Sequence, residues 1–127
     1  MKLEHVAINV PDAKSLANWF VANLGMRIVL ASDASPYMHF VADESGSMLE
    51  LYSNPAAPIP NYADVHPTNL HIAFASSAIE ADRARLIAAG AEPVGEISVT
   101  PTGDKLAFFR GPSQVPFQLV QRQKPLA

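Results

Sequence analysis

The sequence predicts an α+β protein built from two tandem βαβββ modules. Two segments in which apolar and polar residues alternate, 3–10 and 69–76, are each followed by a helical pattern and then by three further strand patterns. A proline-rich stretch between the two series, 54–67, disfavours a regular helix or a central strand. We therefore expect one domain over residues 1–127, with module one at about 1–53, a linker at 54–68 and module two at about 69–122.

In the first module, the strand at 3–10 places Val6, Ile8 and Val10 on one face. A helix is expected next, with Asp12 as its N-cap and Gly25 as its stop. The remaining strands expected in this module span 26–31, 36–42 and 47–53.

The second module repeats this order. After the strand at 69–76, Ser77 and Glu80 form a capping-box pattern for a helix that ends at Gly90. A two-unit repeat leaves its sheet faces exposed, so we expect the copies to cover each other around a pseudo-twofold axis. The remaining strands expected in this module lie around 92–99, 105–110 and 115–121.

Composition excludes several classes of partner and site. The net charge is −3, and the nine basic residues are scattered along the chain, so we expect neither nucleic acid nor an anionic membrane as a partner. There is no cysteine, which excludes disulfides, thiolate metal sites and thiol nucleophiles. No apolar run is long enough to span a membrane and no signal peptide is evident, so a cytoplasmic location is expected.

Polar residues occupy matching strand positions in the two modules. His5 begins HVAINV and His71 begins HIAFAS, while Glu50 in LEL corresponds to Gln118 in FQL. Because alternate side chains of a strand point to opposite faces, all four are expected to point away from the helix-packed face. Their neighbours on that face, such as Ala7 and Ala73, are small enough to leave space for a cavity.

Two imidazoles, a carboxylate and an amide can bind one divalent ion. These nitrogen and oxygen donors suit Zn, Ni, Co, Fe or Mn rather than a soft metal. His5, His71 and Glu50 alone would also make the two-histidine, one-carboxylate site of non-haem iron. The alternative is a buried polar network that holds no metal.

These features resemble the vicinal oxygen chelate superfamily, which includes glyoxalase I, extradiol dioxygenases and bleomycin resistance proteins. The resemblance rests on the paired modules, on HVAINV, LELYS and LHIAF, and on the closing FFRGPSQVPFQLV. It implies an open, barrel-like mixed sheet around a metal, a small-molecule substrate or ligand, and assembly as a homodimer. It also implies His5, Glu50, His71 and Gln118 as metal ligands.

Among these relatives, glyoxalase I is nearest in layout, with a metal that acts as Lewis acid on two adjacent substrate oxygens. The resemblance places a carboxylate, able to act as base, where this chain has Gln118, so Glu50 becomes the candidate catalytic base. The chain also has GPSQ at 111–114, where many relatives have an acidic Asp-Pro-Asp-Gly turn. Candidate pocket residues are Tyr52, His39 and Asn9.

Three functions follow from these residues. The first is a metal-dependent lyase or isomerase of the glyoxalase type, acting on a small compound with adjacent oxygens or on a thiol adduct. The second is a metal-free protein that sequesters a small molecule, as bleomycin resistance proteins do. The third is an Fe(II)-dependent dioxygenase.

Overall fold

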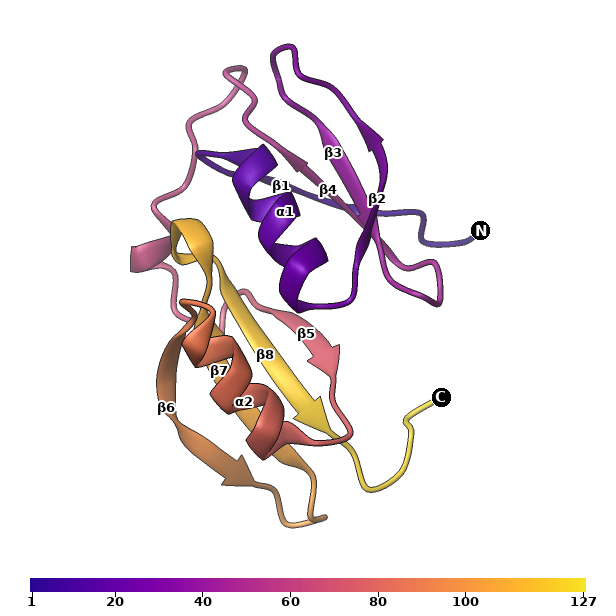
Figure 1. Ribbon diagram of the computed structural model, residues 1–127, viewed down its shortest axis with the longest axis vertical. Coiled ribbons are helices and arrows are strands. Elements are labelled where there is room, and N and C mark those ends of the chain that lie inside the picture. Colours follow the sequence, from indigo (N-terminus) through magenta and orange to yellow (C-terminus); the bar gives the residue numbers. More distant parts are fainter. The chain divides into compact units, whose positions relative to one another are not determined.

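The computed structural model describes residues 1–127, which divide into two compact units, unit 1 at Met1–Pro60 and unit 2 at Asn61–Ala127. Each unit has one four-stranded mixed sheet, with a helix packed on one face (Figure 1). Neither sheet is closed into a barrel. The predicted α+β class, with two βαβββ modules, is confirmed.

Unit 1 has the strand order β1-β4-β3-β2. Strands β1 and β4 are parallel, which requires the crossover that α1 provides, and the other pairs are antiparallel. Its elements are β1 (Val6–Asn9), α1 (Ala13–Asn23), β2 (Arg27–Ala31), β3 (His39–Ala42) and β4 (Met48–Tyr52).

Unit 2 repeats this topology in the order β5-β8-β7-β6, with β5 parallel to β8. It differs by two short 3₁₀ turns, one before β5 and one before β8. Its elements are η1 (Tyr62–Asp64), β5 (Ile72–Ala75), α2 (Ile79–Ala88), β6 (Glu92–Val99), β7 (Lys105–Arg110), η2 (Pro112–Gln114) and β8 (Pro116–Gln121).

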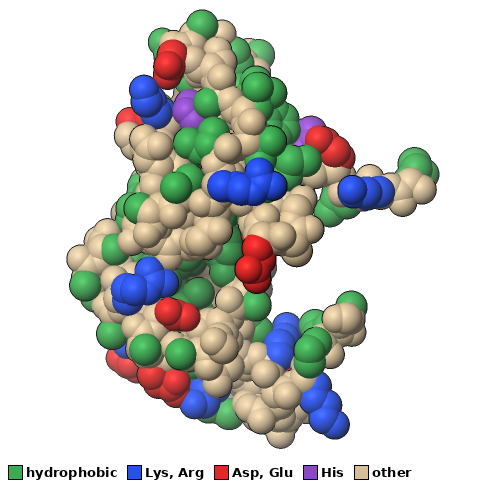
Figure 2. Space-filling view, turned by 45° about the vertical axis from the view of Figure 1, so that its right-hand side comes forward, with side chains coloured by type: hydrophobic (Ala, Val, Ile, Leu, Met, Phe, Trp, Pro, Cys, Tyr) green, Lys and Arg blue, Asp and Glu red, His purple; other side chains and the backbone are tan.

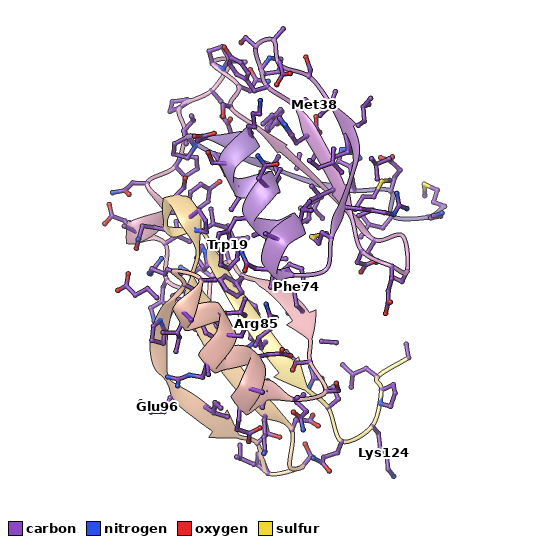
Figure 3. All side chains as sticks on the ribbon, viewed as in Figure 1. Trp19, Met38, Phe74, Arg85, Glu96 and Lys124 are labelled. Carbon is purple, nitrogen blue, oxygen red and sulfur yellow. The ribbon has the colours of Figure 1, made fainter.

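The core of each unit lies between its sheet and its helix. In unit 2 the rings of Phe109 and Phe117 stack with centroids 4.9 Å apart, and Phe74 of β5, which is labelled in Figure 3, packs edge-on against Phe117. Phe109 and Phe117 are almost fully buried, as are Phe20 and Leu51 in unit 1. Burying a side chain of this size stabilises a fold by about 1.5–3 kcal/mol, so these residues fix each helix on its sheet.

The two helices begin differently. The prediction for Asp12 is confirmed, because its carboxylate accepts a hydrogen bond from the backbone N–H of Ser15 at 3.0 Å. The capping box expected from Ser77 is wrong. The N-cap of α2 is Ala78, whose methyl group cannot accept a hydrogen bond. Instead the N–H of Ile79 is bound by a side chain from β8.

Charged side chains of both signs alternate over the surface visible in Figure 2, and no broad basic patch appears on that face. This agrees with the scattered basic residues of the sequence. None of the helices combines the length and apolar character that crossing a bilayer demands.

Candidate functional site

Contacts with α1 distinguish the two faces of the sheet in unit 1. The Oγ atom of Ser53 accepts a hydrogen bond from the backbone N–H of Ala13, the first residue of α1, at 3.1 Å. Leu51, two residues earlier, points to the same side and is fully buried. Glu50 and Tyr52 therefore lie on the opposite side, the helix-free face of this sheet.

The same test identifies the faces in unit 2. The Oε1 atom of Gln121 accepts a hydrogen bond from the N–H of Ile79, at the start of α2, at 2.8 Å. Phe117 and Leu119 alternate in step with Gln121, and both are buried against α2. Gln118 therefore lies on the helix-free face of its sheet, the position that Glu50 occupies in unit 1.

Three side chains gather on the helix-free face of unit 1. The rings of His5 and Phe40 meet edge to face, with centroids 5.1 Å apart. Phe40 stands opposite Glu50 in the pairing of β3 with β4, and Nε2 of His5 lies 3.2 Å from Oε2 of Glu50. We call His5, Phe40 and Glu50 the first trio.

An equivalent set occupies unit 2. His71 meets Phe108 edge to face with centroids 5.2 Å apart, and Phe108 stands opposite Gln118 in the pairing of β7 with β8. The strand registers also agree, since Ala7 pairs with Glu50 and Ala73 with Gln118. We call His71, Phe108 and Gln118 the second trio.

His5 lies between two carboxylates. Its Nδ1 contacts Oε2 of Glu4, and its Nε2 faces Glu50. The hydrogen bond that His5 donates to Glu4 raises the pKa of His5 against the opposing effect of desolvation, and the negative charges of Glu4 and Glu50 raise it further. In the absence of another cation, His5 therefore holds a proton more tightly than a free imidazole does.

The hydrogen-bond roles around His5 constrain what can stand between it and Glu50. An ionised Glu4 can only accept, so Nδ1 of His5 is the donor in that contact. In a neutral His5, Nε2 then carries a lone pair and faces the Glu50 carboxylate, which also can only accept, at 3.2 Å. Two acceptors at this distance need a cation between them, either a proton or a metal ion.

His71 has a fixed tautomer for a different reason. Its Nδ1 lies 2.6 Å from the carbonyl oxygen of Pro67, which can only accept a hydrogen bond. Nδ1 is therefore protonated, and in neutral His71 the lone pair is on Nε2. A histidine whose Nδ1–H donates to a carbonyl is the usual arrangement when Nε2 binds a metal.

Gln118 is 7% exposed, and its amide makes no hydrogen bond with another group of the chain. No fully buried side-chain nitrogen or oxygen lacks a hydrogen-bond partner, so the amide atoms of Gln118 keep access to solvent through the exposed part of the residue. The amide is therefore available to a ligand, through its oxygen as an acceptor or metal donor and through its NH₂ group as a hydrogen-bond donor.

Two of the three predicted pocket residues, Tyr52 and Asn9, lie on the helix-free face of unit 1. Tyr52 lies on the helix-free face with Glu50, and it is half-buried. Asn9 shares that face, but its amide is occupied by the backbone of Asn54 and Ala57. Its role in the structure is therefore to hold the start of the linker.

His39 differs from the expectation. It stands opposite Leu51 in the pairing of β3 with β4, so it points to the α1 side of the sheet, away from Glu50. It is 3% exposed, its Nδ1 lies 2.8 Å from the carbonyl oxygen of Tyr37, and its charge lowers the pKa of Asp12 after the larger effect of the Ser15 hydrogen bonds. This is a buried structural position.

Sequence reasoning missed Glu4 and the two phenylalanines. Glu4 reaches His5 because β1 begins only at Val6, so the alternation of a strand does not separate these neighbours. The sequence did contain a pattern that indicates the two phenylalanines, because Phe40 precedes Glu50 by the same number of residues as Phe108 precedes Gln118.

One surface pocket contains no member of either trio. It has a volume of 390 Å³ and is lined by residues of β5, β8 and the segments that follow them. Its only charged residue, Arg122, is paired with Asp104 at 2.9 Å. The chemistry described above is therefore not located in this pocket, whose lining residues are Ala75, Ser76, Ser77, Val120, Arg122 and Pro125.

Within the two units, no three histidine, aspartate or glutamate side chains come together to form a metal cluster. Unit 1 provides the pair His5 and Glu50, and unit 2 provides His71 with the neutral Gln118. Each unit therefore carries two of the four donors predicted from the sequence.

Comparisons with known proteins agree with this architecture. The sequence profile described as Glyoxalase/Bleomycin resistance protein/Dioxygenase superfamily matches residues 2–119. No curated protein sequence matches the chain.

Similar solved structures cover nearly the whole chain. A glyoxalase family protein from Bacillus cereus has a TM-score of 0.79 at 18% identity, covering 95% of this chain and 93% of its own. TnmS3, an antibiotic binding protein from a Streptomyces species, has a TM-score of 0.73 at 21% identity, covering 97% of each chain. A glyoxalase family protein from Enterococcus faecalis has a TM-score of 0.69 at 25% identity, covering 94% of this chain and 96% of its own.

Proposed function

Because this chain belongs to the glyoxalase, bleomycin resistance protein and dioxygenase superfamily, we propose that it binds a divalent metal ion through His5 and Glu50. We further propose that it acts as a metal-dependent lyase or isomerase on a small compound with two adjacent oxygens. The observation that carries this proposal is the 3.2 Å separation of Nε2 of His5 and Oε2 of Glu50, which face each other and need a proton or a metal ion between them.

The donors fit such a metal. Zinc binds imidazole nitrogen and carboxylate oxygen at about 2.0–2.2 Å, so two ligands of one ion stand roughly 3.0–3.5 Å apart. The separation of His5 Nε2 and Glu50 Oε2, 3.2 Å, lies in that range. The proposed ligand set extends to His71 and Gln118, the equivalent members of the second trio, of which Gln118 is neutral.

When bound, the metal would supply Lewis-acid polarisation of the substrate oxygens. Glu50 is the only carboxylate of the two trios and is therefore the candidate base, able to take a proton from the carbon next to a substrate carbonyl. Glu4 orients His5 and increases the basicity of its imidazole. The Phe40 ring packs against His5 and limits the access of water to it.

A metal-free small-molecule binding protein is the second candidate. It is favoured by the unpartnered amide of Gln118, which suits a neutral ligand with both a donor and an acceptor, and by the adjacent Phe108 ring. In this case the cation between His5 and Glu50 is a proton, and the pair is structural.

The metal content of protein purified without chelator separates these candidates. We expect bound divalent metal in the wild type and its loss in the His5→Ala/His71→Ala double variant. The matched control is Glu44→Ala, because Glu44 is exposed and belongs to neither trio. Equal metal content in the wild type and the double variant would exclude the metal proposal and leave sequestration as the better account.

If metal binds, two assays distinguish the reactions. Turnover of methylglyoxal with glutathione supports the glyoxalase type of reaction, and Glu50→Gln should abolish it. Oxygen consumption with iron-loaded protein and a catechol supports the dioxygenase alternative instead.

A further inference from the structure

Arg110 makes an unusual set of contacts for an arginine near a protein surface. Its guanidinium donates to the carbonyl oxygen of Tyr62 at 2.7 Å, to that of Val65 at 3.0 Å and to that of Gln114 at 3.3 Å. The side chain is half-buried and forms no ion pair with an acidic group. The guanidinium therefore donates to backbone carbonyls in and next to the turns η1 and η2.

The two strongest of these contacts fix one short segment. Tyr62 is the first residue of η1, and Val65 is the residue directly after it. Tyr62 is also buried. Charge-assisted hydrogen bonds to backbone carbonyls are stronger than those between neutral groups. The guanidinium can bind two carbonyls at once because its donors form a planar fork, an arrangement that a lysine does not offer.

This segment leads directly to the group that orients His71. Only His66 separates Val65 from Pro67, whose carbonyl oxygen accepts the hydrogen bond from Nδ1 of His71. The link is stiff, because Pro67 has a fixed φ and restricts the residue before it to extended conformations. The N–H of Asn69 also donates to the carbonyl of His66 at 2.8 Å, which closes the turn.

We propose that Arg110 is a positioning residue for His71. By binding the carbonyls of Tyr62 and Val65, it holds residues 62–67 so that the Pro67 carbonyl meets Nδ1 of His71. His71 is thereby kept in the tautomer that leaves Nε2 as the lone-pair nitrogen. The consequence for ligand affinity rests on the proposed function, whereas the effect on the tautomer does not depend on it.

The test measures the two ring nitrogens of His71 by NMR in metal-free, full-length protein labelled with ¹⁵N-histidine. We expect a protonated Nδ1 and an unprotonated Nε2 in the wild type above the pKa of the ring. Arg110→Met should mix the two tautomers and speed hydrogen exchange of the backbone amides between residues 62 and 71 by about tenfold. Arg110→Lys should fall between, since it keeps the charge but loses the fork.

Two further variants control the test. Arg83→Met is the matched control, because Arg83 also donates to a backbone carbonyl in unit 2, that of Gly95 at 3.2 Å, yet does not contact η1. It should leave His71 and the 62–71 amides unchanged. Pro67→Ala loosens the link without touching Arg110 and should reproduce the tautomer mixing, even if Arg110→Met fails to fold.

The outcomes separate positioning from metal binding. An unchanged His71 tautomer in both Arg110→Lys and Pro67→Ala, with the fold intact, would overturn the inference. Tautomer mixing together with an affinity for added Zn²⁺ about tenfold lower in Arg110→Met supports it and links it to the proposed function. Tautomer mixing in a protein that binds no metal supports the positioning role and rejects the proposed metal site.

Discussion

The two units use one scaffold with different charges. His5 and His71 each contact a phenylalanine edge to face, at centroid distances of 5.1 and 5.2 Å. Their Nδ1 atoms are fixed by unlike groups, an exposed carboxylate of Glu4 in unit 1 and the carbonyl of a buried Pro67 in unit 2. The comparison shows that the two units share the same strand register but differ in the charge of the groups around their histidines.

The difference assigns unequal tasks to the two trios. The first trio has an anionic member, Glu50, and the pKa of its histidine is raised by the neighbouring carboxylates Glu4 and Glu50. The second trio contains no carboxylate, since Gln118 has the position in unit 2 that Glu50 has in unit 1. Under the proposed function, the negative charge that holds the metal therefore comes from Glu50.

Removing the charge of Glu50 should have the largest effect on metal affinity. Glu50→Gln keeps the size of the side chain but removes its charge, and we expect Zn²⁺ affinity to fall by more than about 100-fold, beyond the 10–100-fold that outer contacts usually provide. Gln118→Ala should weaken binding less, because only a neutral donor is lost. Calorimetric titration of both variants checks the order, and equal losses would contradict the unequal roles.

Making the trios equal in charge should strengthen binding. Gln118→Glu adds a second carboxylate to the ligand set, and we expect Zn²⁺ affinity to rise by roughly tenfold to a hundredfold. The same titration measures it, with Gln114→Glu, an exposed position on η2, as the control for a general change in net charge. An affinity no higher than in the control would show that Gln118 does not contact the metal.

Removing the anchor of His5 should lower its pKa. Glu4→Gln replaces the charged acceptor of the hydrogen bond that is the main cause of the raised pKa with a neutral one, so the NMR titration midpoint of His5 should move down, while Glu44→Gln in an exposed turn leaves it unchanged. We also expect Zn²⁺ affinity at about pH 8 to fall by roughly tenfold, because the imidazole loses its anchor. A midpoint that stays in place would mean that Glu4 is not the cause.

The same pKa sets the sign of a pH effect. Because the pKa of His5 is raised in the folded chain, its proton stabilises the fold at low pH, and this contribution is lost as pH rises through the folded pKa. Metal binding should show the opposite trend, strengthening with rising pH as the competing proton leaves.

The smallest expected effects concern the helix caps. Asp12→Ala removes the side-chain cap of α1 and should cost about 1 kcal/mol of unfolding free energy. Gln121→Ala should cost a similar amount, about 1 kcal/mol, because Gln121 caps α2 from β8. Ser77→Ala, measured in the same urea titrations, should change stability by less than about 0.5 kcal/mol, and a larger loss would reinstate Ser77 as a cap.

Local pattern was enough to predict much of the fold. The alternation in HVAINV and HIAFAS gave the faces of β1 and β5, and the N-cap role of Asp12 followed from its place before an apolar helical pattern. The α2 cap was mispredicted because its acceptor, Gln121, is distant in sequence. A capping pattern can predict only partners within a few residues.

Predicting the site was limited by the same dependence on distant residues. The alternation of side chains along a strand correctly placed Glu50 and Tyr52 on one face of the sheet. The prediction of His39 as a pocket residue was wrong, because its face depends on the pairing of β3 with β4, and the sequence YMHF does not show where β3 begins. From the sequence, Arg110 was interpreted as a charged surface residue. Its partners are backbone carbonyls, which every residue has, so the sequence does not identify them.

A crystal structure of the protein grown with Zn²⁺, with anomalous scattering recorded at the zinc edge, tests the central claim most directly. The account predicts an anomalous peak within about 2.0–2.2 Å of both Nε2 of His5 and a carboxylate oxygen of Glu50. A peak at another site, or a His5 and Glu50 pair that retains its direct contact with no zinc between them, would contradict it.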